Sequence, residues 1–204
     1  MTLPFPFRAP AALLALLLAG CGASPPPRYY TLVPAAPPPL AAGSARLLVE
    51  VLPVGVPERL NREEIVLSGA GPALEVRDGE RWAAPLADEI RQQVADALWQ
   101  RLRAADSYAA PPPPGGPLPQ FRLALRLERL EARPDRQAMV EGSWTLRKLP
   151  GGQPAACRAG FAVTAADAGT PALVAALSDG STRLAQAVAA SLERLANGQA
   201  EPCS

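Results

Sequence analysis

The sequence contains no histidine, and this absence removes several kinds of catalytic and metal site. Histidine is the commonest general base, the base of the Ser-His-Asp triad and a frequent zinc ligand. The sequence also lacks a Gly-x-Ser-x-Gly motif, a phosphate-binding loop and a dinucleotide-binding glycine motif. It therefore predicts a protein that is not an enzyme and that binds no cofactor and no metal.

An excess of positive charge is missing as well. The chain has 20 basic and 19 acidic residues, Lys148 is its only lysine, and no run of Lys and Arg occurs. Proteins that bind nucleic acid concentrate positive charge on one face or along one helix. We therefore expect no nucleic acid among its partners.

The sequence also lacks a hydrophobic run long enough to cross a bilayer, which takes ~20 residues. Its longest run, Ala11–Ala19, has the length of the apolar part of a signal peptide. Leu18-Ala19-Gly20-Cys21 follows and matches a lipobox. The sequence thus predicts cleavage between Gly20 and Cys21 and a covalent lipid, such as palmitate, on Cys21. The alternative is an ordinary secreted protein with an incidental cysteine.

The residue after the lipidated cysteine bears on the destination of a lipoprotein. An Asp at that position favours retention at the inner membrane of enteric bacteria, and here Gly22 stands instead. Two or more acyl chains make a stable anchor. We therefore expect a lipid-anchored protein at the periplasmic face of the outer membrane.

Two further cysteines, Cys157 and Cys203, remain once Cys21 carries lipid. An even number of cysteines in an oxidising compartment favours a disulfide. Such a bond would tie the C-terminal tail to the domain. The alternative is two free thiols, one in a strand and one in a frayed tail.

Composition divides the chain into four parts. We expect a signal peptide over 1–20, a lipidated proline-rich tether over 21–44, a single domain over 45–198, and a tail over 199–204. Inside the tether, the β-prone run Arg28–Val33 interrupts two proline clusters. This run either pairs with another chain or completes the sheet of its own domain.

Hydrophobic periodicity predicts the elements of the domain. Strands are expected at 46–54, 63–68 and 73–76, with turns at 57–62 and at Asp78-Gly79. An i+4 apolar stripe from Trp82 to Leu102 predicts a helix.

After an exposed proline-rich loop at 111–117, period-2 alternation predicts three strands near 121–128, 140–146 and 157–163. A last helix is expected over 171–195, with a break at Asp179-Gly180. Strands in a meander with helices on one face indicate an α+β fold, in which an antiparallel β-sheet packs against two helices.

Three segments, taken in order and spacing, resemble the PqiC-like family. They are Arg28–Leu32 shortly after the lipobox, Val54–Val66, and Arg81–Ala87. PqiC-like proteins are auxiliary lipoprotein components of MCE-type (mammalian cell entry) lipid transport systems, which belong to the ABC type. The similarity extends from Arg28 to the final helix. The family-motif residues, which are also candidate partner contacts, are Tyr29, Tyr30, Thr31, Leu32, Pro57, Leu60, Arg81 and Trp82.

The resemblance implies a non-catalytic outer-membrane lipoprotein that serves as a docking subunit. Its partners would be a periplasm-spanning MCE-domain protein, the inner-membrane permease or ABC transporter, membrane lipid, and further copies of the chain. The cargo would be phospholipid or another lipid. An alternative is a structural lipoprotein that assists outer-membrane assembly, similar in layout to the lipopolysaccharide-assembly lipoproteins. A periplasmic hydrolase is disfavoured because histidine and a nucleophile motif are missing.

Overall fold

The structure, a computed structural model, describes residues 25–34, 39–69, 71–108, 110–111, 117–199 and 201–203. The predicted signal peptide, its cleavage site between Gly20 and Cys21, and the predicted lipidation site Cys21 lie outside the described residues. Residues 25–34 and 39–44 of the predicted tether and nearly all of the predicted domain lie within them.

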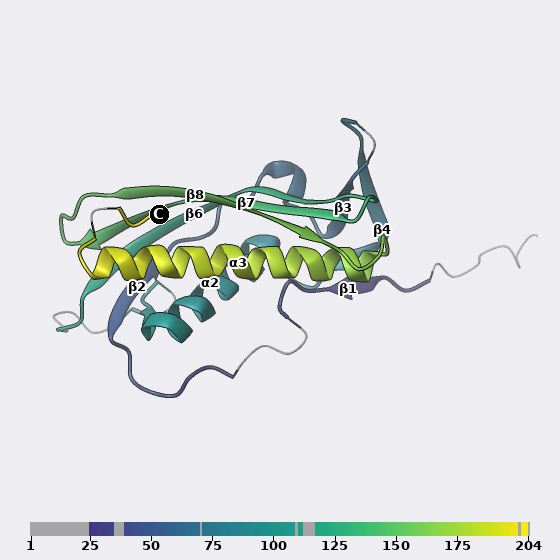
Figure 1. Cartoon of the computed structure of the whole chain (residues 1–204). Coiled ribbons are helices and arrows are strands. Elements are labelled where there is room, and N and C mark those ends of the chain that lie inside the picture. The colour runs from purple at the N-terminus through teal and green to yellow at the C-terminus, as the bar shows by residue number, and fades with distance from the viewer. Residues whose placement is uncertain are drawn as a thin grey trace, which may run out of the picture.

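Two sheets and two helices form the fold of the described residues (Figure 1). The larger sheet has the strand order β5-β2-β6-β7-β8, and the smaller has the order β1-β4-β3. The helices lie on one face of the larger sheet, so the predicted α+β class is confirmed. The element bounds are β1 Arg28–Tyr30, β2 Leu47–Val51, a 3-10 turn η1 Glu58–Leu60, β3 Glu64–Ser68, β4 Leu74–Trp82, α2 Leu86–Leu102, β5 Ala104–Asp106, β6 Gln120–Ala132, β7 Gln137–Leu149, β8 Ala155–Thr164 and α3 Thr170–Ala196.

The predicted meander is confirmed. Strand β6 pairs antiparallel with β7 along nearly its whole length, and β7 pairs antiparallel with β8. The alternating apolar side chains of β6, such as Phe121 and Leu123, are buried, while their neighbours face solvent or the sheet rim. A half-buried sheet produces this period of two because successive side chains point to opposite faces.

The antiparallel sheet expected from the sequence is only part of the structure, because both sheets are mixed. Strand β2 lies between β5 and β6 and pairs parallel with both, and β1 pairs parallel with β4. Strand β5, which is only three residues long, was not predicted. Hydrophobic alternation states which face of a strand is buried but carries no information on the direction of its neighbour.

The turn predicted at Asp78-Gly79 was also wrong. Strand β4 runs through both residues, and the register of its pairing with β3 shifts there: Glu64 lies opposite Arg81, whereas Ile65 lies opposite Arg77. The extra residues of β4 form a bulge, which is a common role for Gly in a strand.

Helix α3 is continuous, so the break expected at Asp179-Gly180 does not exist. Gly180 lies where the helix comes closest to β7: a Cβ added there would meet Val140 Cγ2 at 2.7 Å. The glycine therefore permits close packing of helix on sheet. In Figure 1 α3 extends along the length of the larger sheet with α2 beside it, and β1 lies near its N-terminal end.

Candidate functional site

The N-terminal segment docks onto its own domain. In the parallel pairing of β1 with β4, Tyr29 lies opposite Arg81 and Tyr30 opposite Trp82. The Ala83 N–H donates a 2.7 Å hydrogen bond to the Tyr30 carbonyl and extends the ladder. Two motifs that are far apart in sequence thus form one feature of the fold. Of the two interpretations of Arg28–Val33, the structure has the strand that completes the sheet.

Leu32 is the centre of this docking and is completely buried. Its N–H and the Thr31 hydroxyl both donate to Glu89 Oε2 on α2, at 3.2 and 2.7 Å. Its carbonyl accepts hydrogen bonds from Gln93 Nε2 on α2 and Ser178 Oγ on α3. We call the segment Tyr30–Leu32 with these partners the docking seam. Because Glu89 is itself buried, its carboxylate depends on the seam for hydrogen bonds.

Tyr30 connects the docking seam to the first turn of α3. Its hydroxyl donates to Glu80 Oε1 at 3.3 Å, and the Thr170 hydroxyl donates to Glu80 Oε2 at 2.6 Å. Tyr29 takes no part in these contacts, and its side chain is 63 % exposed. The two adjacent tyrosines of the motif therefore have different roles.

The remaining family-motif residues divide in the same way. Leu60 and Trp82 are buried in the core, and Pro57 closes the η1 turn by accepting from the Leu60 N–H at 2.8 Å. Arg81 is half-buried, and its guanidinium pairs with Glu63 at 3.1 Å. Most of these residues thus build the domain, whereas Tyr29 presents its aromatic ring to the outside.

A groove of about 530 Å³ lies between α2 and α3, beside the docking seam. Val33 and Leu40 are exposed at its rim, and Ala97, Ala185 and Ala189 are among the residues that line it. Among the described residues, the Gln93 Oε1 atom in its wall is buried without a hydrogen-bond partner. The sequence shows only that both helices carry small residues. The groove arises from the way in which α2 and α3 pack against each other.

Asp96 also lines this groove. Burial raises the pKa of the Asp96 carboxyl above its ordinary value, and a hydrogen bond from Gln92 opposes that change. Asp96 is the only acidic residue among the described residues that line the groove.

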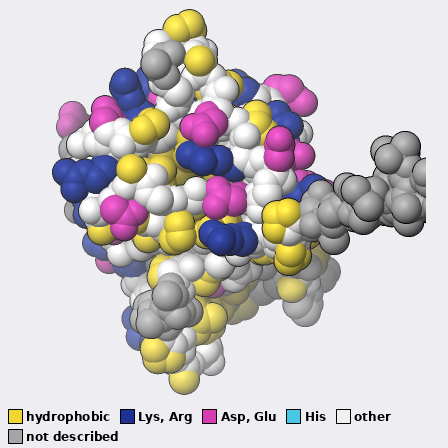
Figure 2. All heavy atoms as spheres, turned by 90° about the vertical axis from the view of Figure 1, so that its right-hand side faces the viewer, with side chains coloured by type: hydrophobic (Ala, Val, Ile, Leu, Met, Phe, Trp, Pro, Cys, Tyr) yellow, Lys and Arg dark blue, Asp and Glu magenta, His cyan; other side chains and the backbone are white. Residues whose placement is uncertain are grey.

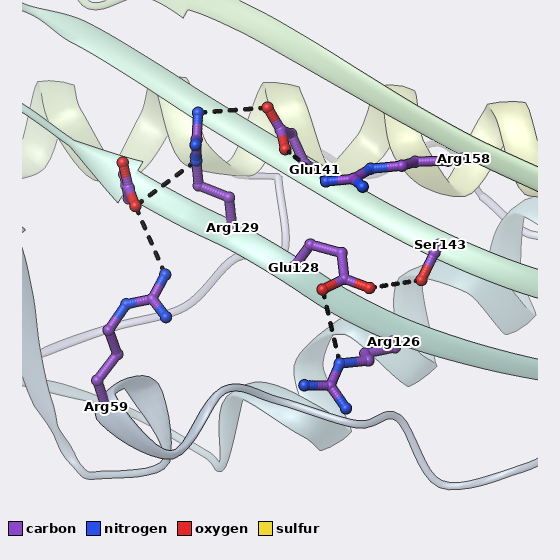
Figure 3. Close-up of polar contacts among 8 residues, drawn as sticks. Arg59, Arg126, Glu128, Arg129, Glu141, Ser143 and Arg158 are labelled. Carbon is purple, nitrogen blue, oxygen red and sulfur yellow. Dashed lines mark hydrogen bonds and ion pairs between the residues drawn. The ribbon is translucent and has the colours of Figure 1, made fainter.

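The face of the larger sheet that the helices leave open carries a network of ion pairs (Figure 3). Arg129 and Arg158 both contact Glu141, at 3.3 and 3.4 Å, and Arg126 approaches Glu128 at 3.6 Å. The Ser143 hydroxyl donates to Glu128 at 2.6 Å, and this bond, with Arg126 nearby, holds the pKa of the Glu128 carboxyl below its ordinary value. Alternating charges of this kind make a hydrophilic surface and contribute little stability each.

The C-terminal tail is joined to the start of β8. Cys157 and Cys203 form a disulfide, and their Cα atoms are 5.2 Å apart. Arg194 Nε donates a further 2.9 Å hydrogen bond to the Pro202 carbonyl. In the chain-entropy model a loop of this length contributes about 4 kcal/mol of stability.

Within the described ranges, the structure brings no three His, Cys, Asp or Glu side chains together in a way that could hold a metal ion. In the same part of the chain, neither helix has the length and the apolar character that a membrane span requires.

The comparisons with known proteins agree with this architecture. A crystal structure of an uncharacterized protein is similar with a TM-score of 0.64 and 18 % identity, covering 82 % of this chain and 99 % of that one. Protein XCC0632 from Xanthomonas campestris, of the DUF330 family, is similar with a TM-score of 0.57 and 17 % identity, covering 80 % of this chain and 90 % of its own. At these identities the likeness shows a common fold. A search of the curated proteins finds no match.

A family model matches residues 30–189, which is well over half of the chain and includes the docking seam, every strand after β1 and most of α3. Its description is an ABC-type transport auxiliary lipoprotein component. The resemblance to PqiC-like proteins is thereby confirmed, and the chain belongs to the family of ABC-type transport auxiliary lipoproteins.

Proposed function

We propose that this protein is a non-catalytic docking subunit of an MCE-type lipid transport system, anchored by a lipid on Cys21 to the periplasmic face of the outer membrane. The observation that carries the proposal is the family match over residues 30–189, which assigns the chain to auxiliary lipoproteins of ABC-type transport. An auxiliary lipoprotein of a transporter acts by holding or guiding other components. Its partners are then a periplasm-spanning MCE-domain protein and, through it, the inner-membrane transporter.

The docking seam supports this proposal mechanically. Leu32 is buried, and its backbone groups form hydrogen bonds with both α2 and α3. The N-terminal segment that leads to the proposed anchor is therefore fixed to the domain. The open face of the larger sheet, with its Arg129–Glu141–Arg158 network, offers a broad polar surface to a protein partner. Polar, charged surfaces of this kind favour specific and reversible contacts between proteins.

The test is affinity capture from detergent-solubilised membranes of the native host with the full chain and with Cys21→Ser. The full chain is expected in the outer-membrane fraction and should retain an MCE-domain protein. Cys21→Ser should leave the membrane fraction and retain much less of it. Failure of the wild-type chain to retain any MCE-domain protein would contradict the proposal, and retention of a β-barrel assembly protein would support the alternative of an outer-membrane assembly factor.

A further inference from the structure

Tyr29 is a family-motif residue whose aromatic side chain the fold leaves exposed. Its neighbours Tyr30, Thr31 and Leu32 are all engaged with α2, α3 or β4. Tyr29 is 63 % exposed, more than any other large apolar or aromatic side chain among the described residues. A tyrosine combines an apolar ring with a polar hydroxyl, which suits a boundary between water and lipid.

The position of Tyr29 relative to the anchor supplies the second observation. Pairing with β4 begins at Arg28, seven residues after Cys21. Seven residues span at most about 25 Å when fully extended. If Cys21 carries the lipid, as in the proposed function, the end of the domain formed by β1, β3 and β4 cannot lie farther than this from the membrane.

The charges at this end are compatible with such a position. Arg81 pairs with Glu63, Arg62 with Glu64 and Arg77 with Glu75, at 2.9 to 3.3 Å. Figure 2 views the molecule from this end and shows basic and acidic side chains interspersed on it. Since these charges are compensated, contact with a membrane does not depend on attraction to anionic lipids.

The opposite end of the molecule is far from the anchor. Helix α3 begins near β4, where Thr170 contacts Glu80, and its 27 residues give it a length of about 40 Å. Strand β7 follows it toward the same far end, where Lys148 is exposed. This end therefore points toward other components if the β1 end is held at the membrane.

We propose that the end of the domain formed by β1, β3 and β4 rests on the lipid surface, with Tyr29 between the headgroups and the Lys148 end directed away from the membrane. This inference rests on the lipid anchor of the proposed function. It goes beyond that function because it assigns a membrane-contact residue and an orientation. The occupant of the surface is a lipid headgroup layer, zwitterionic or anionic.

The first test uses the lipidated full chain in phosphatidylcholine vesicles whose acyl chains are brominated. Bromine quenches an indole only at close range, so Tyr29→Trp should lose much of the emission that the new indole adds. Tyr108→Trp is the matched control because Tyr108 is also exposed, at 47 %, but lies beside Arg91 at the end of β5. It should keep its added emission. No quenching of Tyr29→Trp, or equal quenching of both variants, would overturn the proposal.

The second test measures orientation. Because Lys148 is the only lysine, an amine-reactive donor dye marks the far end without any substitution. Arg28→Lys in a Lys148→Arg background places the dye at the near end, and Lys148→Arg alone reports labelling of other amines. Energy transfer to an acceptor dye on the headgroups should be strong from the near position and weak from Lys148. Equal transfer from both would mean that the molecule lies on its side and would overturn the proposed orientation.

Both measurements use vesicles that contain only this protein. Failure to capture an MCE-domain protein would therefore contradict the proposed function and leave the membrane contact standing. Absence of quenching with a lipidated chain would do the reverse.

Discussion

At the scale of single residues, Leu32 and Glu89 illustrate how a short motif holds a fold together. Leu32 fills the core between two helices, and its backbone groups form hydrogen bonds with Glu89 and Gln93. A buried carboxylate without hydrogen bonds is costly, and so is an apolar cavity. The segment is therefore part of the domain and not merely a spacer before it.

Leu32→Ala is expected to lower the free energy of unfolding by about 2–4 kcal/mol because it leaves a cavity in the core. Urea unfolding of the chain without its lipid, monitored by tryptophan fluorescence, measures the change. Val33→Ala is the neighbouring control, since Val33 is 38 % exposed and should lose about 1 kcal/mol or less. Equal losses from the two variants would show that Leu32 does not have the role assigned to it.

At the scale of elements, the contact between α3 and β7 is set by two glycines. A Cβ on Gly142 of β7 would meet Leu184 at 2.9 Å, and a Cβ on Gly180 of α3 would meet Val140 at 2.7 Å. Helix and strand approach each other reciprocally, each offering a glycine to a branched side chain of the other. Such close packing leaves no room for an additional methyl group.

Gly180→Ala is expected to destabilise the protein, although Ala favours a helix over Gly by about 1 kcal/mol. The new methyl group has no space against Val140, and overpacking costs about 1–3 kcal/mol. Thermal unfolding of Gly180→Ala, Val140→Ala and the double variant measures the coupling. The double variant should be more stable than the sum of the single losses implies. An increase in stability of Gly180→Ala alone would contradict the close approach.

At the scale of the whole molecule, the domain boundary is the main change from the sequence-based division. The sequence placed the start of the domain near residue 45, yet β1 and the docking seam lie upstream of it. If Cys21 carries the lipid, as in the proposed function, β1 begins only seven residues after the anchor, which would hold the domain near the membrane.

A chain that begins at residue 45 is expected to be less stable than one that begins at residue 25. It loses β1, the buried Leu32 and both hydrogen bonds to Glu89. We therefore expect its free energy of unfolding to fall by about 3–5 kcal/mol. The melting temperatures of the chains that begin at residues 25 and 45, both without lipid, are compared. A chain starting at residue 33 should behave like the shorter one, and equal melting temperatures for all three would refute the docking seam.

Local pattern determined much of this protein by itself. Alternation predicts the three strands of the meander, and the i+4 stripe predicts α2, because each depends only on residues near one another in sequence. The helix begins at Leu86, because Trp82, which the stripe placed in the helix, is the last residue of β4. The leader and the lipid anchor at Cys21 stay predictions. The family motifs could also be recognised in the sequence, but their structural roles could not.

Tertiary structure decided how these parts meet. It made β2 and β1 parallel strands, kept α3 continuous through Gly180, created the groove between α2 and α3, and brought Tyr30 beside Trp82. These outcomes depend on contacts between residues far apart in the chain, which periodicity does not encode. The different roles of Tyr29 and Tyr30 follow from the same cause: two identical residues became different only when one turned toward Glu80 and the other toward solvent.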